Sequence, residues 1–415
     1  MSDYSEEIER APVIFFLGAG ASVALGKPTT LGFWKQLKDN PLAPKEAYEL
    51  LLQLEKDVGG AKPIDIEVIL DSLQDWELEA DKLAQHPVST KLGAIQEGLS
   101  DNLARQTHQA ILSRVIDTYS EVNHNDAYSL WGPIFEEIWA LNIHTLPIFT
   151  TNYDTVIEQA VLFSDDILRS DKVAAKYEAS DSKEYQHLTP ERYLTLRDGF
   201  SLAHREFARW HHWDFHGYHE DEAKLAVTLF KLHGSVTWSF IDLEEREERI
   251  GDRLYRRLEG DVGLVPPEAG RNPLGRTTAI HYPYLSKSVP SHDIYDVAYN
   301  YFRSCLMFCK LCVAVGSSFR DEKVVEAIIE SALIKTVEPT GKKRRKQGWK
   351  EIPIRHEGNK LKILTVAPEP DHFILQKMLK DHPKNPPIEV IPFEGKFDKD
   401  TAPAVMDSIK QLLVE

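Results

Sequence analysis

An apolar run that breaks into two closely spaced glycines constrains the fold of this chain more than any other feature. Residues 13–17 read VIFFL, and Gly18 and Gly20 follow at once in the stretch GAGAS. Such a run is typical of a buried strand that ends in a tight turn before a helix. The turn predicts either a backbone that approaches a ligand closely or a purely structural connection, and the glycines alone favour neither.

This turn lacks the signatures of two common phosphate-binding loops. The dinucleotide fingerprint requires a third glycine three places after the second, and Val23 holds that place. The lysine loop of nucleoside triphosphatases is excluded as well, because no Gly-Lys-Ser or Gly-Lys-Thr follows. A different kind of site has to explain the two glycines.

Three further apolar runs end in turns of the same kind. They are followed by the segments 151–154 (TNYD), 316–318 (GSS) and 367–369 (APE), and segments of helical periodicity lie between the runs. Strands that alternate with helices predict an α/β fold with a Rossmann-like parallel sheet covered by helices. Ligands of such sheets bind beyond the carboxyl ends of the strands, so we expect the four turns to meet at one site.

The hydrophobic pattern also predicts how the chain is divided. Residues 1–39 and 141–415 carry the strand signals and are expected to form the nucleotide-binding core. Residues 40–140 have apolar side chains at helical spacing and are interpreted as a helical insertion subdomain. A second insertion, about 160–225, is rich in aromatic residues and histidine and predicts turns and short strands. Its histidines between 211 and 219 show no matching carboxylate pattern, which argues against a metal site.

Charge and composition narrow the function classes. Lys and Arg total 49 against 65 Asp and Glu, a net charge of −16, which argues against a general nucleic-acid binder. No apolar segment reaches the length of a membrane span, and the polar start is unlike a signal peptide, so we expect a cytoplasmic protein without membrane contact. The basic run 342–346 is interpreted as a solvated loop, with an indirect contact to a partner or nucleic acid as the alternative.

The three cysteines are too few for a disulfide framework and suit a reducing compartment. Cys309 and Cys312 have the spacing of a zinc knuckle, but no second pair or histidine partner lies near them in the sequence. Together with Cys305 they are predicted to be small core residues, and no metal is expected in this chain.

Four motifs in order resemble those of the sirtuin family. GAGAS resembles the family's Gly-Ala-Gly-x-Ser phosphate loop, and Gly26-Lys27-Pro28 matches the Gly-x-Pro that follows it. TTNYD resembles Thr-Gln-Asn-Ile-Asp, LHGS resembles the segment with the catalytic histidine, and VGSSF resembles the late Gly-Thr-Ser turn. The resemblance covers the nucleotide-binding core and leaves both insertions unexplained.

Two departures from the family pattern bear on the activity. The Asp-Phe-Arg of protein deacylases is replaced here by Thr29-Thr30-Leu31, and the four-cysteine zinc ribbon is absent from the sequence. The chain is instead similar to the sirtuin-like NAD+ hydrolases of bacterial anti-phage defence, in which a Gly-x-Ser-Phe-x-x-Asp turn is common. The turn here is Gly316-Ser317-Ser318-Phe319-Arg320-Asp321, with one residue between Phe319 and Asp321. That resemblance implies cleavage of NAD+ to nicotinamide and ADP-ribose, with NAD+ as substrate. It also implies a homo-oligomer and a partner such as a HerA-type ATPase.

The resemblance implies roles for individual residues, and their chemistry is consistent with those roles. Asn152 offers an amide donor and acceptor to a water and the ribose, and His233 can accept a proton near neutral pH. Asp154 is expected to accept the carboxamide N–H of nicotinamide. The remaining binding residues are expected at the pyrophosphate (Gly18, Ala19, Gly20, Ser22), at the adenosine ribose and phosphate (Gly316, Ser317, Ser318) and on the adenine side (Glu369).

Structural alternatives stand beside these roles. Ser22 and Asp154 are also suitable helix N-caps, and a histidine such as His233 can be an ordinary core residue. Two other functions remain open as well: a sensor that binds NAD+ or ADP-ribose without cleaving it, and an NAD-dependent protein deacylase.

Overall fold

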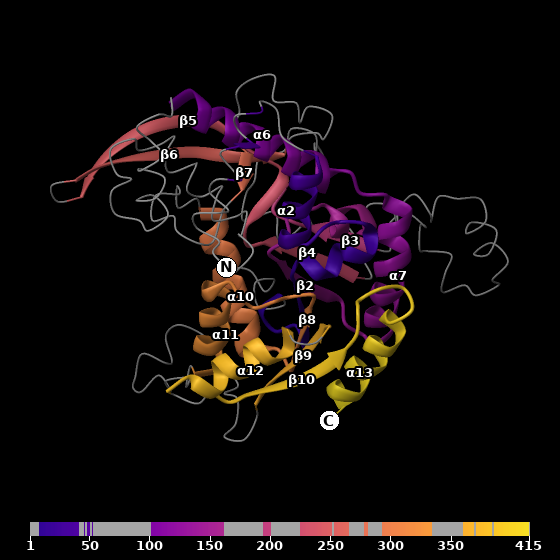
Figure 1. Cartoon of the computed structure of the whole chain (residues 1–415). Helices are drawn as coiled ribbons and strands as arrows, with labels where there is room; N and C mark the ends of the chain where they lie inside the picture. The colour runs from indigo at the N-terminus through magenta and orange to yellow at the C-terminus, as the bar shows by residue number, and fades with distance from the viewer. Residues whose placement is uncertain are drawn as a thin grey trace, which may run out of the picture.

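The computed structural model describes residues 8–40, 45, 48–49, 52, 101–161, 194–200, 225–250, 253–264, 278–280, 293–333, 360–368, 371–383 and 386–414. Figure 1 shows these parts of the chain as helices and strands in sequence colours. All structural statements below concern these residues.

Seven strands form the main sheet, and every neighbouring pair is parallel. Their order is β10-β9-β8-β1-β2-β4-β3 (Figure 1). The bounds are β1 (Val13–Leu17), β2 (Thr145–Thr150), β3 (Leu194–Arg197), β4 (Leu225–Lys231), β8 (Leu311–Val315), β9 (Leu361–Ala367) and β10 (Ile388–Glu394). This arrangement confirms the predicted α/β fold with a Rossmann-like parallel sheet.

Helices cover both faces of this sheet, as predicted. On one face α10 (Asp293–Phe308), α11 (Glu322–Leu333) and α12 (Asp371–Asp381) share a hydrophobic cluster with the strands. On the other face α7 (His124–Ala140) and α13 (Ala402–Val414) share a second cluster with them. Side chains alternate along a strand, so the neighbours Phe16 and Phe15 of β1 belong to the first and the second cluster respectively.

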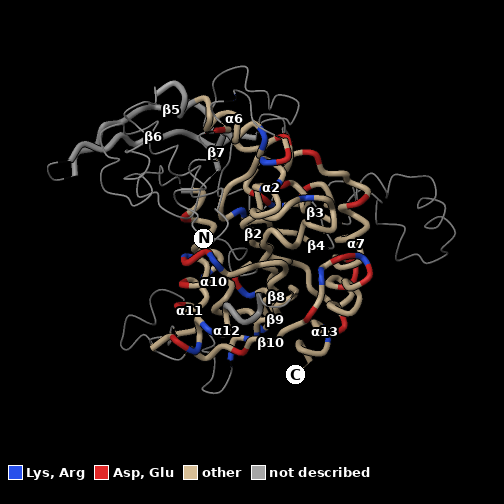
Figure 2. Tube along the Cα trace, in the orientation of Figure 1, with Lys and Arg blue, Asp and Glu red and all other residues tan. Residues whose placement is uncertain are grey.

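The central strands β1, β2 and β8 are mainly apolar because they are buried on both faces. All residues of β1, β2 and β8 are buried, and none of them is charged. In Figure 2 these strands are correspondingly tan, while the charged residues lie mainly on the helices. Continuous apolar runs of this kind are typical of parallel sheets, which is why the sequence indicated these strands clearly.

A second, antiparallel sheet has the order β6-β5-β7, with β5 (Gly234–Ile250), β6 (Arg253–Leu264) and β7 (Thr278–Ile280). The run AVTLFKLHGSVTW is typical of a strand that is broken by His233 and Gly234 near its end. The structure has two strands there, because β4 ends at Lys231 and β5 begins at Gly234 in the other sheet. The turn between them uses the positive φ of +81° at Gly234, a conformation that favours glycine. Strands β5 and β6 also include residues 241–250 and 253–260 of a charged stretch whose pattern does not indicate strands.

Both stretches interpreted as insertions contribute to the main sheet or its cover. Strand β3, from within 160–225, pairs with the edge of β4, and helix α7, from within 40–140, packs on the second face. Two further helices, α2 (Thr30–Asp39) and α6 (Asp101–Ser120), contact each other, because the ring centroids of Phe33 and Tyr119 lie 5.8 Å apart. The division into a core and two insertions remains a prediction, because most residues of the insertions lie outside the described ranges. None of the described helices is long and apolar enough to cross a bilayer.

The strand order has a switch point beside β1. From β1 the chain moves to β2, then to β3 at the edge of the sheet and back to β4 between β2 and β3, and it later returns to β8 on the opposite side of β1. The connections after β1 and β8 therefore diverge and leave a crevice at their carboxyl ends. This is the place where three of the turns singled out in the sequence meet.

Candidate functional site

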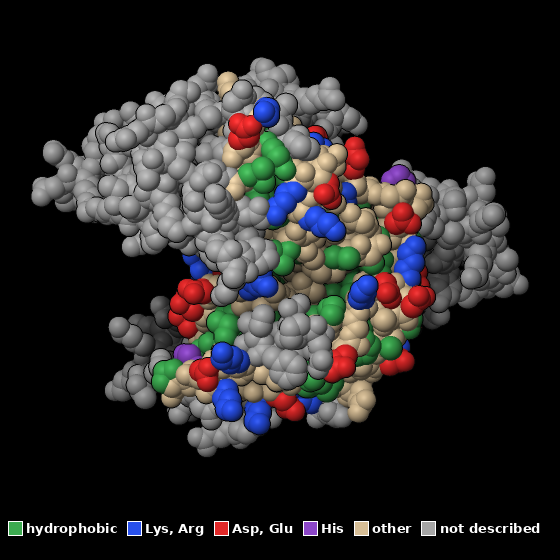
Figure 3. Space-filling view, viewed as in Figure 1, with side chains coloured by type: hydrophobic (Ala, Val, Ile, Leu, Met, Phe, Trp, Pro, Cys, Tyr) green, Lys and Arg blue, Asp and Glu red, His purple; other side chains and the backbone are tan. Residues whose placement is uncertain are grey.

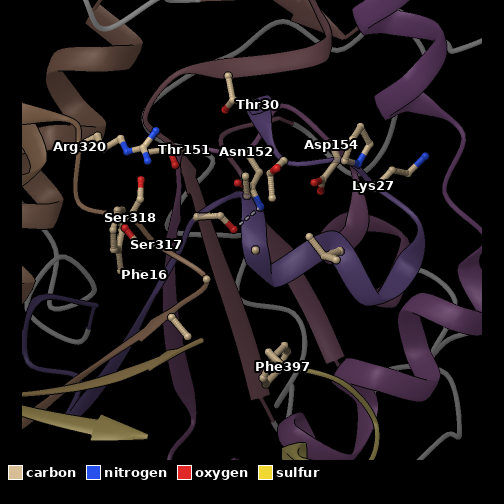
Figure 4. Close-up of a pocket in the computed structure, with 18 of the residues that line it drawn as sticks. Phe16, Lys27, Thr30, Thr151, Asn152, Asp154, Ser317, Ser318, Arg320 and Phe397 are labelled. Carbon is tan, nitrogen blue, oxygen red and sulfur yellow. Dashed lines mark hydrogen bonds between the residues drawn. The ribbon is translucent and has the colours of Figure 1, made fainter. Parts of the chain in front are cut away.

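A cavity of about 730 Å³ lies at the carboxyl ends of these strands. Its volume is within the range of small-molecule binding sites in proteins. Most of the residues expected from the sequence line it: Gly18, Ala19, Gly20, Asn152, Asp154, His233, Gly316, Ser317 and Ser318. In Figure 4, Asp154 and Lys27 lie to one side of Asn152, and Ser317 and Ser318 lie to the other.

The turns after β1 and β8 touch each other through their backbones. The N–H of Gly18 donates to Val315 O at 2.9 Å, and the N–H of Gly20 donates to Gly316 O at 2.9 Å. A Cβ atom on Gly18 would lie 2.6 Å from Cα of Ser317, and one on Gly20 would lie 2.7 Å from Cα of Gly316. Side chains at these positions would collide with the neighbouring backbone, so the turns require both glycines whether or not a ligand binds.

The contact between the two turns gives a structural reason for the glycines at 18 and 20. The sequence suggested that the missing side chains let a ligand approach, but the backbone that approaches is that of the other turn. The N–H groups of Gly18 and Gly20 are bonded within the protein, and the N–H of Ala21 donates to Gly18 O at 2.9 Å. A bound phosphate would therefore have to use other donors of the cavity wall.

Asn152 is fixed by its side-chain nitrogen. Its Nδ2 donates to Gly18 O at 3.0 Å and to Ser22 Oγ at 3.2 Å, and the residue is 8% exposed. Because a carbonyl oxygen can only accept, the bond to Gly18 settles which end of the amide carries the nitrogen. Ser22 is 3% exposed and lies beneath Asn152, outside the lining of the cavity. Its observed contact is with this asparagine.

Asp154 lines the cavity and also starts a helix. Its Oδ1 accepts the N–H of Val156 at 3.1 Å, in front of the helical residues 156–161. This bond is the structural alternative considered from the sequence, and it does not remove the carboxylate from the cavity wall. Asp154 is 5% exposed.

His233 lies in the turn between β4 and β5, where it is 2% exposed and lines the cavity. Its Nε2 lies 2.7 Å from Oδ2 of Asp321, which follows β8 in a different part of the chain. The ring of Tyr153 lies beside it, with ring centroids 6.5 Å apart. An imidazole with a carboxylate partner at this distance is oriented and can hold a proton, as in other histidine–carboxylate pairs.

Asp321 is the functional residue that the sequence analysis quoted in a motif but gave no role. Its Oδ1 accepts the N–H of Lys323 at 2.9 Å and that of Val324 at 3.4 Å, which caps helix α11. Burial alone would raise its pKa, but the hydrogen bond and charge of His233 and the two capping N–H groups together lower the pKa below its ordinary value. Tyr299 donates its O–H to Oδ2 at 3.2 Å. The N-cap pattern before α11 was the available sequence signal, and it does not indicate the histidine.

Lys27 and helix α6 form another wall of the cavity. The ammonium of Lys27 donates to Thr118 O at 2.8 Å and to Glu121 O, at the carboxyl end of α6. Burial lowers the pKa of Lys27, and the carboxylates of Asp154 and Glu121 oppose that effect. Tyr119 lines the same wall and donates to Pro28 O at 3.0 Å. A helix that falls in the predicted insertion thus contributes directly to the site.

A buried ion pair lies directly below the turn that carries Asn152 and Asp154. Nζ of Lys231 lies 3.0 Å from Oε1 of Glu158, and Lys231 also donates to the main-chain oxygen of Asp154. Burial raises the pKa of Glu158, while the neighbouring charge of Lys231 partly offsets that rise. Neither charged residue was singled out from the sequence.

The far end of the cavity includes residues that the sequence did not indicate. Lys396, Phe397 and Asp398, which follow β10, line it together with Pro368, which follows β9. Glu369, expected on the adenine side, lies outside the described residues. Arg320 also lines the cavity, and Figure 4 shows it beside Ser318. On the described surface of the face in Figure 3, positive and negative side chains are interspersed.

The cysteines are buried, as predicted. All three are free thiols in the core, and burial raises the pKa of Cys305 well above its ordinary value. Within the described ranges, no three histidine, cysteine or acidic side chains gather in a group that could hold a metal ion. The histidines between 211 and 219 lie outside those ranges.

Comparison with known proteins finds only weak similarity in sequence and structure. No model of a protein family matches the chain, and no curated protein matches it. Solved Sir2 structures are similar to it. One, described as the structural basis for the mechanism and regulation of Sir2 enzymes, has 11% identity, a TM-score of 0.34 and coverage of 100% of both chains. A Sir2 complex with a p53 peptide and NAD+ has 10% identity, a TM-score of 0.34 and coverage of 99% of each chain. Values this low do not transfer a function, and the fold assignment rests on the strand order described above.

Proposed function

We propose that this chain is an NAD+ hydrolase that releases nicotinamide and ADP-ribose. The observation that carries the proposal is the convergence of Asn152, Asp154 and a carboxylate-paired His233 on one cavity of about 730 Å³. Asn152 and Asp154 follow β2, His233 follows β4 and its partner Asp321 follows β8, and they are brought together near the switch point of a parallel sheet. The motifs that carry the sirtuin resemblance contribute the same residues.

The reaction breaks the bond between C1′ of the ribose and the nicotinamide nitrogen, and a water oxygen bonds to C1′. Nicotinamide leaves as a neutral molecule, and the water gives up one proton. The ribose passes through a state with oxocarbenium character, as in glycoside hydrolysis. The site therefore has to hold the ribose, place the water and accept the proton.

In this proposal each polar residue has one task. Asn152, fixed through Nδ2, presents its side-chain oxygen to the water and the ribose hydroxyls. His233 accepts the proton from the water or a ribose hydroxyl, and Asp321 holds the imidazole and stabilises its charged form. Asp154 accepts the carboxamide N–H of nicotinamide. The turn at Gly316 and the residues Ser317 and Ser318 hold the adenosine ribose and a phosphate.

The charged residues of the wall suit such a substrate. Arg320 and Lys396 line the cavity at different positions, and each is a cation for the anionic pyrophosphate. A mixed rather than uniformly basic cavity is consistent with a dinucleotide that carries both phosphates and a cationic pyridinium ring.

The deciding experiment is incubation of the purified chain with NAD+ and chromatographic detection of nicotinamide and ADP-ribose. Stoichiometric release of both products without any peptide supports the hydrolase. Saturable binding of NAD+ without release of nicotinamide would show the sensor instead. Nicotinamide release that depends on an acetylated peptide and yields a deacetylated peptide would show the deacylase.

We further propose that the enzyme acts in the cytoplasm in anti-phage defence, where cleavage depletes the NAD+ of the infected cell. The support is the sequence resemblance to that branch of sirtuin-like proteins. The same resemblance leads us to propose a homo-oligomer and activation by a partner such as a HerA-type ATPase, with any nucleic-acid contact made indirectly. Turnover measured alone and with the product of a neighbouring gene, on samples of known mass, tests these proposals.

A further inference from the structure

Two opposite charges lie buried under the cavity, and the proposed chemistry does not use them. The side chains of Lys231 and Glu158 are 2% and 10% exposed, and their charged atoms are 3.0 Å apart. Lys231 is the last residue of β4, and it lies in register with Thr150, the last residue of β2. Its side chain therefore ends beneath the turn 151–154, which carries Asn152.

Lys231 contacts this turn directly. Besides Glu158, its ammonium donates to the main-chain oxygen of Asp154. The side chain of the same aspartate is held separately by the N–H of Val156. The turn is thus tied to β4 from below, to its own helix at one end and, through Asn152, to the glycine-containing turn at the other.

Stability does not explain why charged residues occupy these positions. Replacing a buried ion pair by apolar residues of similar volume is often neutral or stabilising, because each charge loses its hydration on burial. Apolar side chains, among them Trp131, Ile157 and Leu229, line one part of the small space beside the pair, and polar residues of the turn line the rest. That space measures only about 10 Å³, so the turn is closely packed against the pair.

We propose that Lys231, paired with Glu158, is a positioning residue that fixes the main chain at Asp154 and thereby the orientation of Asn152 and Asp154 in the cavity. The inference deepens the proposed function and rests on it. The ammonium supplies a directional bond to the carbonyl of Asp154 that no apolar side chain can replace. Glu158 supplies the countercharge that lets the ammonium remain in the interior.

The double variant Lys231→Met/Glu158→Met tests this role, because it removes both charges and roughly retains the volumes. We expect a melting temperature equal to or above that of the wild type. At saturating NAD+ we expect kcat to fall about tenfold or more, with KM changed less than about threefold, because small displacements of reacting groups slow the chemical step. Hydrogen exchange of the amides at 152–156 should be faster than in the wild type.

Two comparisons separate positioning from a general effect of charge removal. Glu158→Gln leaves the bond from Lys231 to the Asp154 carbonyl in place, so this variant should retain more activity than Lys231→Met at a temperature where both are folded. The control Lys410→Met/Glu137→Gln removes a Lys–Glu pair of 2.6 Å between α13 and α7. Neither residue lines the cavity, and kcat and exchange at 152–156 should be unchanged.

Wild-type kcat and wild-type exchange at 152–156 in the folded Lys231→Met/Glu158→Met variant would overturn the proposal. A double variant that fails to fold would also overturn it, since the pair would then be a structural requirement. If the wild type does not cleave NAD+, the proposed function fails. The exchange measurement still decides in that case whether Lys231 positions the turn.

Discussion

The two halves of the cavity wall are built in different ways. Around Gly18, Gly20 and Gly316 the wall is backbone, and its shape depends on the absence of side chains that would collide. Around Asn152, Asp154 and His233 the wall is side chain. Asn152 and His233 are held by partners from distant parts of the chain, and Asp154 is held by the N–H of Val156 in the helical turn that follows it. The backbone half is therefore sensitive to added volume, whereas the side-chain half is sensitive to lost hydrogen bonds.

The largest effect on stability is expected from a Cβ atom added to the backbone half of the wall. Gly316 has a φ of +62°, and a Cβ atom there would lie 2.3 Å from the nitrogen of Ala21. Gly316→Ala should lower the free energy of unfolding by about 3 kcal/mol, because it combines strained backbone with overpacking. Gly26 has a φ of +76° but open space around its Cβ position, so Gly26→Ala should cost only about 1 kcal/mol. Denaturant titration of both variants measures the difference, and equal losses would show that the contact between the turns is not the cause.

In the side-chain half, Asn152→Ala should have the largest effect on catalysis. We expect the rate of NAD+ cleavage to fall about a thousandfold or more, since the variant loses the group that orients the water and the ribose. The stability loss should be modest, about 1–3 kcal/mol for the acceptors left without their donor. Ser22→Ala removes only one of the two anchors of the amide and should slow cleavage about tenfold. A folded Asn152→Ala protein with wild-type turnover would rule out this mechanism.

Substitutions of His233 and Asp321 should slow NAD+ cleavage to different extents. His233→Ala is expected to slow cleavage at saturating NAD+ about a hundredfold, the usual contribution of a positioned proton acceptor, with little change in melting temperature. Asp321→Asn keeps a similar shape but removes the charge that stabilises the protonated ring, so we expect a loss of about tenfold. Steady-state rates of the purified variants provide the test. Normal turnover in the folded His233→Ala variant would show that another residue acts as the base.

The lowered pKa of Asp321 predicts how stability depends on pH. A carboxylate whose pKa is lower in the folded than in the unfolded state stabilises the fold above the unfolded pKa, which is 3.8 for an ordinary aspartate. That contribution is lost as the pH falls through the folded pKa. The stability difference between wild type and Asp321→Asn should therefore be largest near neutral pH and shrink below pH 3.8. Denaturant titrations across this range measure it, and a difference that is constant with pH would contradict the assignment.

The smallest effect is expected from removal of metals. Treatment with EDTA should change neither the rate of NAD+ cleavage nor the melting temperature, because neither half of the wall offers a ligand set for a metal ion among the described residues. Activity that is lost with EDTA and restored by zinc would show that the cysteines or the histidines between 211 and 219 had been misinterpreted.

Much of the fold could be predicted from the sequence. Strands buried on both faces, such as β1 and β8, are short continuous apolar runs, and the helices α10, α11 and α13 have clear helical periodicity. Strands β5 and β6 were not predicted over their charged part, because an antiparallel ribbon does not require two buried faces. The short edge strand β3 gave too little pattern to be located.

Part of the candidate site could also be predicted from the sequence, because some of its residues lie in turns that follow apolar strands. The turns that end apolar strands are recognisable from local sequence, which indicates Gly18, Asn152, His233 and Gly316, and all four line the cavity. Partners that are far away in the chain carry no local signal. Asp321 lies 88 residues from His233, and Lys231 lies 77 residues from Asp154.

The sequence by itself determined that this chain forms a parallel α/β sheet with polar turns at the strand ends, because burial on both faces requires continuous apolar strands. Only the tertiary structure decided that Gly18 and Gly20 serve the contact with the turn at Gly316, and that His233 is paired with Asp321. A local pattern indicates the backbone conformation that a residue requires and the face of the helix or strand on which it lies. Which distant residue supplies a hydrogen bond depends on the order in which the strands are arranged, and that order is set by packing across the whole sheet.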